Sequence, residues 1–232
     1  MEIAFKTDIG IRRENNEDCC YANEKFAIVA DGMGGHNKGE VASSMVVEIL
    51  KEKLGNSKKI SKDVLNKAII SANRSIYSKS EADISFKGMG TTVVCCAWDD
   101  KKITLGHIGD SRCYAVMQSG IFQLTDDHTL VHQLVVEGKL TEQEAQDYPD
   151  QHVITRAVGT DPNEKPDIKV IDRKDVQWLV LCSDGLSNYV DADSILACIE
   201  QSESSEGAAE KLVELAKCGG GADNISVVLV RF

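Results

Sequence analysis

Four aspartates stand where apolar, strand-like runs end or begin, and this placement could bring their carboxylates together. Asp31 and Asp184 each follow an apolar run and precede glycine, in FAIVADG and WLVLCSDG. Asp110 follows a third run, and Asp223 comes just before the terminal one. A single Asp-Gly pair is usually only a turn. In an antiparallel sheet, however, the end of one strand and the start of its neighbour share an edge. The pattern therefore predicts that these carboxylates converge.

Converging carboxylates need neutralisation. Two of them about 5 Å apart repel by roughly 3 kcal/mol at an effective dielectric of about 20. Either their pKa values rise or cations bind between them. Oxygen ligands favour hard ions such as Mg²⁺ and Mn²⁺, and no nearby pair of histidines or cysteines favours a softer metal. The sequence therefore predicts a Mg²⁺ or Mn²⁺ site.

The N-terminal segment RENNED adds residues that suit phosphate chemistry. Taken alone it would be a charged surface turn. Beside a metal site, Arg13 offers a bidentate fork for a phosphate group, and Asp18 adds a further hard ligand. The combination predicts a site for a phosphorylated substrate.

Length and charge restrict the class of protein. The 232 residues, 42 % of them hydrophobic, suit one compact domain. The start MEIAFKTDIG lacks the features of a secretory signal, and no run is long enough to span a bilayer. The net charge of −11 argues against binding to nucleic acid or anionic membranes. We expect one domain over residues 1–232, in the cytoplasm, monomeric and without membrane insertion.

The eight cysteines are interpreted as reduced and mostly buried. Two adjacent pairs, at Cys19 and Cys95, would point to opposite faces of a strand and would rarely form internal bridges. The chain has no C-x-x-C, so a structural zinc site is not expected.

Strands and helices are expected in separate groups. Two hairpins are predicted from apolar runs joined by short polar turns, at 91–98 with 103–108 and at 112–117 with 121–124. Helical periodicity, with caps at Ser61 and Thr141, predicts helices in these ranges: 41–50, 64–76, 130–136, a short one after 141, and 207–217. Helices early and late, with strands between, favour helices on both outer faces of a strand-rich centre.

Six motifs then occur in one order along the chain. They are RENNED (13–18), DGMGGH (31–36), GMGTT (88–92), GDSR (109–112), SDG (183–185) and DN (223–224). In this order they resemble the metal-dependent protein phosphatase family (PPM, type 2C), and HVITRAVG at 152–159 resembles its bacterial branch. Each motif alone is weak, whereas the ordered set spans nearly the whole chain.

The resemblance implies an α+β fold, a four-layer α/β/β/α sandwich of two antiparallel sheets flanked by helices, with a flap within 122–160. It implies hydrolysis of phosphoserine and phosphothreonine in proteins by a water that two Mn²⁺ or Mg²⁺ ions activate, with a possible third, weaker ion. The expected partners are phosphorylated proteins and a Ser/Thr kinase whose products are the substrates. Asp126 to His128 and Thr160 to Asp161 could contact substrate in the flap.

The resemblance also assigns roles to individual residues. Asp31 would bridge the two ions, and Gly32 would contribute its carbonyl. Asp184 and Asp223 would hold one ion, and Asp110 with Asp184 the third. Arg13 would bind the substrate phosphate. Glu17, Asp18 and Asn224 would act through waters and hydrogen bonds around the ions. Asp18 is also expected to be a metal ligand.

Two departures from eukaryotic relatives affect these roles. Met33 stands where many of them place a histidine after Asp-Gly, so the proton for the leaving group could come from His36 or from a metal-bound water. Asn188 stands where they often have another acidic ligand, which predicts weaker binding of the third ion.

Other classes of phosphate-binding protein are excluded because the sequence lacks their characteristic motifs. No cysteine is followed six residues later by arginine, as cysteine phosphatases require, and 191–195 ends wrongly for a haloacid-type motif. A nucleotide P-loop would need lysine where Glu40 stands. The remaining alternative is a catalytically inactive relative that binds phosphoproteins and regulates them.

Overall fold

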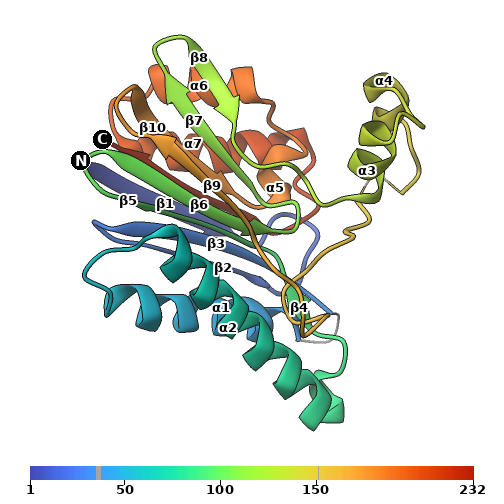
Figure 1. Cartoon of the computed structure of the whole chain (residues 1–232). Coiled ribbons are helices and arrows are strands. Elements are labelled where there is room, and N and C mark those ends of the chain that lie inside the picture. Colours follow the sequence, from blue (N-terminus) through green and yellow to red (C-terminus); the bar gives the residue numbers. More distant parts are fainter. Residues whose placement is uncertain (35–37, 151) are drawn as a thin grey trace.

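The computed structural model describes residues 1–34, 38–150 and 152–232. Two antiparallel sheets pack face to face, with helices on both outer sides (Figure 1). The expected α+β sandwich of two sheets flanked by helices is confirmed. Among the described residues, no helix is both long and apolar enough to cross a membrane.

One sheet of the described chain has the order β1-β11-β10-β7-β8. Its strands are β1 (Glu2–Asp8), β7 (Arg112–Met117), β8 (Gly120–Gln123), β10 (Val176–Cys182) and β11 (Ile225–Arg231). The other has the order β2-β3-β5-β6-β9, with β4 paired to β3. Its strands are β2 (Asp18–Ala22), β3 (Phe26–Met33), β4 (Gly90–Thr91), β5 (Val93–Trp98), β6 (Lys102–Ile108) and β9 (Asp167–Asp172).

The helices lie in two layers and one projecting segment. Helices α1 (Gly39–Gly55) and α2 (Lys62–Ala82) cover the sheet of β3, and α6 (Ala192–Glu200) and α7 (Ser205–Gly219) cover the sheet of β11. The short elements η1 (Ile84–Phe86) and α5 (Asp184–Ser187) follow α2 and β10. Helices α3 (Leu130–Val136) and α4 (Glu142–Gln146) stand apart from the sandwich (Figure 1). The predicted flap contains these two helices, and its role stays a prediction.

Alternation along the strands explains the layers, because successive side chains point to opposite faces of a sheet. On β3, Ile28 packs toward α1 and α2, while Val29 packs into the layer between the sheets. On β11, Leu229 packs toward α6 and α7, and Val228 and Val230 into the central layer. All of these side chains are fully buried.

Most local expectations are close to the structure. Ser61 caps α2, and Thr141 and Glu144 form the predicted capping box of α4. The last helix begins at Ser205, earlier than expected, because Ser204 accepts a hydrogen bond from the Gly207 N–H and acts as its N-cap. The eight cysteines are free thiols, five of them buried, and Cys218 is exposed.

The strand predicted in FAIVADG extends one residue further than expected. Strand β3 continues past Asp31 and Gly32 to Met33, where it pairs with β4. The Thr91 side chain donates a hydrogen bond to the Asp31 carbonyl at 2.8 Å. Pairing with β4 extends β3 past Asp31, and the hydrogen bond from Thr91 fixes the Asp31 backbone.

Candidate metal centre

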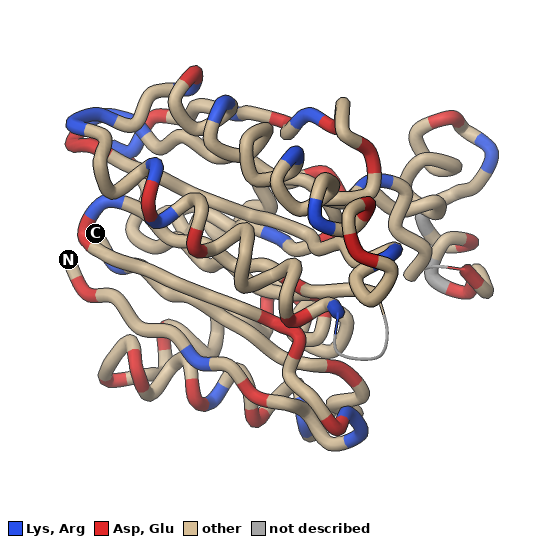
Figure 2. The backbone as a smooth tube through the Cα atoms, turned by 90° about the horizontal axis from the view of Figure 1, so that it is seen from below, with Lys and Arg blue, Asp and Glu red and all other residues tan. Residues whose placement is uncertain are grey.

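Five aspartates from both sheets gather at one end of the sandwich. Asp18 on β2 is paired directly with Asp31 on β3. Asp184 opens α5 after β10, and Asp223 precedes β11, the antiparallel neighbour of β10. Asp110 follows β6. Several acidic positions from separate strands lie close together at this end in Figure 2. The convergence predicted from the strand ends is therefore present.

A hydrogen bond joins the two sheets at this point. The Ser183 hydroxyl, at the end of β10, donates to the Asp18 carboxylate at 2.7 Å. The same hydroxyl accepts from the Ser226 N–H of β11 at 3.0 Å. Asp18 is thereby held at a fixed position between β2 and the sheet of β10 and β11.

Burial and mutual repulsion disfavour the charged forms of these carboxyls. Burial, and secondarily Asp184 and Asp223, raise the pKa of Asp18 to about 7, although its hydrogen bond with Ser183 opposes the shift. Burial and the charge of Asp184 raise the pKa of Asp110 to about 7 as well. The pKa of Asp31 is raised well above its usual range, first by burial and then by the surrounding aspartates. A cluster of this kind binds either protons or cations.

Unpaired oxygens show that the carboxylates fit cations. Within the described chain, one oxygen each of Asp18, Asp110 and Asp184 is buried and has no hydrogen-bond partner. Buried polar atoms without partners are rare and costly. Three carboxylate oxygens that lack a donor suit hard cations, whose preferred ligands are oxygens.

The backbone beside Asp31 is closely packed. A Cβ atom on Gly32 would collide with the Gly39 carbonyl and would lie 2.6 Å from the Glu17 carbonyl. Glycine is therefore required at position 32. The Gly32 N–H donates to the Glu17 carbonyl at 3.2 Å, and the Ser43 hydroxyl donates to the same oxygen at 2.6 Å. Glu17 thus joins β3 to the start of α1.

Asn224 holds the N-terminal segment against β11. Its side-chain oxygen accepts from the Glu17 N–H at 2.8 Å. Its amide group donates to the carbonyls of Ile9 at 3.0 Å and Asn15 at 2.9 Å. The Asn224 side chain therefore fixes the N-terminal segment beside the start of β11.

Arg13 lies at the edge of the cluster. Its guanidinium contacts the Asp223 carboxylate at 2.7 Å, and about half of its side chain is exposed. It also lines a cavity of about 510 Å³ together with Asp31, Gly32, Asp184 and Asp223. Arg13 therefore lies beside the aspartates and remains accessible to solvent.

Comparison with known proteins decides the family. The model of the protein phosphatase 2C family matches residues 12–217. A 2C-type phosphatase of Streptococcus pyogenes serotype M6, named as putative, is 38 % identical over 100 % of this chain and 97 % of its own. The chain belongs to the protein phosphatase 2C family. The resemblance seen in the six motifs, and the expectation of a protein phosphatase, are confirmed.

Solved structures agree with this family. The serine/threonine phosphatase Stp1 from Staphylococcus aureus superposes with a TM-score of 0.93, at 33 % identity over 100 % of this chain and 94 % of that chain. The catalytic domain of the phosphatase PstP, solved in complex with two manganese ions, has a TM-score of 0.88. It is 35 % identical over 98 % of this chain and 96 % of that chain. These relatives support the bacterial branch.

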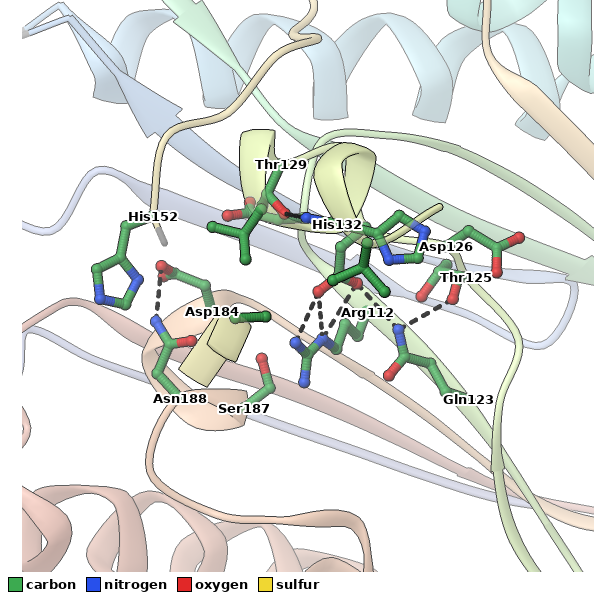
Figure 3. Close-up of a pocket in the computed structure, with 15 residues that line it drawn as sticks. Arg112, Gln123, Thr125, Asp126, Thr129, His132, His152, Asp184, Ser187 and Asn188 are labelled. Carbon is green, nitrogen blue, oxygen red and sulfur yellow. Dashed lines mark hydrogen bonds and ion pairs between the residues drawn. The ribbon is translucent and has the colours of Figure 1, made fainter. Parts of the chain in front are cut away.

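The structure describes every predicted site residue of this phosphatase except one. The structure brings together Arg13, Asp18, Asp31, Gly32, Asp110, Asp184 and Asp223, with Glu17 and Asn224 behind them. Their metal binding stays a prediction. His36 lies outside the described residues. Asn188 donates to the Asp184 carboxylate at 3.0 Å, so an amide stands beside this ligand (Figure 3).

Sequence reasoning missed His152 as a site residue. It lines the 510 Å³ cavity and also a larger adjoining one of about 700 Å³, which share Asp110 and Asp184 (Figure 3). The motif HVITRAVG contained the signal, since His152 is its first residue. The motif could not show that the segment folds back over Asp184.

A histidine cluster supports the turn before Asp110 in this phosphatase. The His128 ring nitrogen Nδ1 accepts from the Gly109 N–H at 3.0 Å, and His107 Nε2 lies 3.1 Å from the Gly109 carbonyl. Gly109 has φ +110°, which favours glycine. Among the described residues, His107, His128 and Asp167 form a group whose possible metal-ligand atoms all lie within 4.8 Å of one another.

This trio does not suit a metal. Both ring nitrogens of His128 are already in contact within the protein: Nδ1 accepts from the Gly109 N–H, and Nε2 lies 3.1 Å from Asp167 Oδ2 and 2.8 Å from the Arg156 guanidinium. The Arg156 guanidinium lies 2.9 Å from the other Asp167 oxygen. The cluster is therefore a hydrogen-bonded support for the Asp110 turn.

Proposed function

We propose that the chain hydrolyses phosphoserine and phosphothreonine in other proteins, with two Mn²⁺ or Mg²⁺ ions held by the aspartate cluster. The main supporting observation is that Asp31, Asp110, Asp184 and Asp223 line one cavity with Arg13, and that Asp110 and Asp184 each have a buried oxygen without a hydrogen-bond partner. The relative solved with two manganese ions supports the choice and number of ions.

The proposed ligands are divided between two ions. Asp31, whose carboxyl is surrounded by four other aspartates, would be a ligand of both ions. Gly32 would add its carbonyl, and Asp184 and Asp223 would hold one ion. Asp18 and Glu17 would act through ordered waters, and Asp110 with Asp184 would form a weaker third site. When bound, the ions lower the pKa of a water molecule and offset negative charge on the phosphate.

The chain's own groups bind the phosphate and supply a proton. The guanidinium of Arg13 binds two phosphate oxygens and orients phosphorus toward the aspartate cluster. Of the described histidines, His152 is the one that lines both cavities, and we assign to it the proton given to the departing Ser or Thr oxygen.

The reaction consumes phosphoproteins, so a Ser/Thr kinase must supply its substrates. The proposed setting is the cytoplasm, and the proposed state is a monomer. The rival function is that of an inactive relative that binds phosphoproteins. Asp31, Asp110, Asp184 and Asp223 are all retained around one cavity, and this favours the enzyme.

The deciding experiment uses a phosphothreonine peptide and purified protein with Mn²⁺, with and without a chelator. We expect phosphate release with Mn²⁺ and its loss on chelation. Rapid release without metal would exclude the proposed mechanism. Tight peptide binding without any turnover, in protein that has bound Mn²⁺, would favour the regulatory rival.

Arg13→Ala is expected to raise the KM for the peptide roughly tenfold, with a smaller effect on kcat, because a hydrogen bond to a charged group contributes about 1.5–3 kcal/mol. Steady-state kinetics of the wild type, Arg13→Ala and Arg13→Lys measure the effect. The lysine variant keeps the charge but loses the fork, so an intermediate KM is expected. Unchanged KM and kcat in Arg13→Ala would remove Arg13 from substrate binding.

A further inference from the structure

A second chamber adjoins the metal centre. It has a volume of about 700 Å³ and shares Asp110, His152 and Asp184 with the cavity that contains Arg13. The end of the β7–β8 hairpin, the loop that follows it, and helices α3 and α5 form its walls (Figure 3). A phosphoresidue bound at the metal centre therefore has a neighbouring space for the adjacent part of the same polypeptide.

The walls of the chamber combine apolar and acidic surfaces. Val131, Val135 and Ala145 line it from the segment that stands apart from the sandwich. Asp126 lines it as well, and 76 % of its side chain is exposed. The cation facing it is Lys169, 3.9 Å away, whose ammonium group already donates to the Leu124 carbonyl at 2.7 Å. Asp126 therefore presents a weakly neutralised carboxylate.

The chamber is not built for a second anion. Among the described residues that line it, Arg112 is the only lysine or arginine. Its guanidinium is bound to Asp127 through two nitrogens, at 2.9 and 2.6 Å to the same oxygen, and both side chains are mostly buried. The Arg112 charge is therefore neutralised within the protein.

Asp110 connects the chamber to the proposed metal centre. It is more than nine-tenths buried, it lines the chamber, and within the described chain its Oδ1 has no hydrogen-bond partner. This oxygen is part of the proposed weaker ion site at the inner end of the chamber. The chamber thus has one acidic rim, at Asp126, and an apolar wall, and its described lining has no lysine or arginine that is free of an ion pair.

We propose that this chamber binds a lysine or arginine side chain of the substrate, close in sequence to the phosphoresidue. Such side chains place an apolar stem on an apolar surface and keep the charged head in a polar, hydrated position. Here the stem lies against Val131 and Val135, and the head reaches Asp126. Residues of an extended peptide rise about 3.3 Å each, so the basic residue lies within about three positions of the phosphoresidue. The inference rests on the proposed phosphatase activity at the adjoining centre.

The test is a set of phosphothreonine peptides in which one flanking position at a time is Lys, Ala or Glu. With Mn²⁺, the wild type is expected to show about fivefold higher kcat/KM for Lys than for Ala at one position, as for a partly exposed ion pair, and a lower value for Glu. In Asp126→Asn the Lys-to-Ala ratio falls toward one. In Asp126→Lys the order reverses, and the Glu peptide becomes the better substrate.

Asp100→Asn is the matched control. It makes the same change of charge at an exposed position in the turn between β5 and β6, at the far end of β6 from Asp110. The Lys-to-Ala ratio is expected to stay at the wild-type value in this variant.

The outcomes separate this inference from the proposed function. Cleavage of all peptides at equal rates would overturn the chamber's role and leave the phosphatase activity in place. A Lys preference that survives in both Asp126 variants would also overturn it. If no phosphothreonine peptide is cleaved with Mn²⁺, both proposals fail together.

Discussion

Asp31→Asn and Asp184→Asn are each expected to lower kcat for a phosphothreonine peptide by at least about a thousandfold, a loss of roughly 4 kcal/mol of transition-state stabilisation. Asparagine removes the negative charge and one anionic ligand oxygen, so the ions bind weakly or in altered positions. Kinetics at saturating Mn²⁺ and calorimetric titration with Mn²⁺ measure the two effects. Both variants should show weaker metal binding together with the loss of turnover.

The fold should survive these changes. Backbone groups of Asp31 make its structural contacts: its N–H donates to the Thr92 hydroxyl at 2.9 Å, and its carbonyl accepts from the Thr92 N–H at 2.8 Å. Asparagine keeps both. Circular dichroism should therefore show wild-type secondary structure and a melting temperature that is not lower without metal. Near-normal turnover in either purified variant would exclude that aspartate from the metal centre.

The metal-free protein is expected to become more stable as the pH falls from 8 to 5. Asp18 and Asp110 each have a pKa of about 7 in the folded chain, compared with about 3.9 when unfolded. A raised folded-state pKa gives a stabilising contribution that is complete below about pH 4 and is lost as the pH rises through about 7. Between pH 7 and 5 each group contributes about 2 kcal/mol, or roughly 4–8 °C in Tm for a domain of this size.

Thermal unfolding in chelator at several pH values checks this prediction. Saturating Mn²⁺ should raise the Tm near pH 7.5 and reduce its dependence on pH, because cations then replace the protons and stabilise the folded state. Asp18→Asn should reduce the pH dependence of the metal-free protein, since one of the two groups is gone. A metal-free Tm that rises from pH 5 to 8 would contradict the predicted burial of these carboxyls.

The sequence predicted the local structure well where the signals lie within a few residues. The capping box at Thr141, the N-cap at Ser61 and the hairpin turn near Asp99 depend on side chains that bond to their own segment. The buried strands β5 and β10 are also evident as apolar runs. Strands β1, β2 and β9 were not identified, because they lie at sheet edges and few of their side chains are buried.

The sequence by itself determined the kind of chemistry. Aspartates after apolar strands, with an arginine in RENNED, predict oxygen ligands for a metal and a site for a phosphate group regardless of how the strands are ordered. The ordered motifs specified the family.

Only the tertiary structure decided which groups meet. Asp18 opposes Asp31 because of the register of β2 and β3, and Ser183 reaches Asp18 from 165 residues away because the two sheets pack together. His152 and the chamber beside Asp126 depend on a segment that folds back over the end of the sheets. These contacts join distant parts of the chain, so their geometry follows from strand register and sheet packing, which no short stretch of sequence encodes.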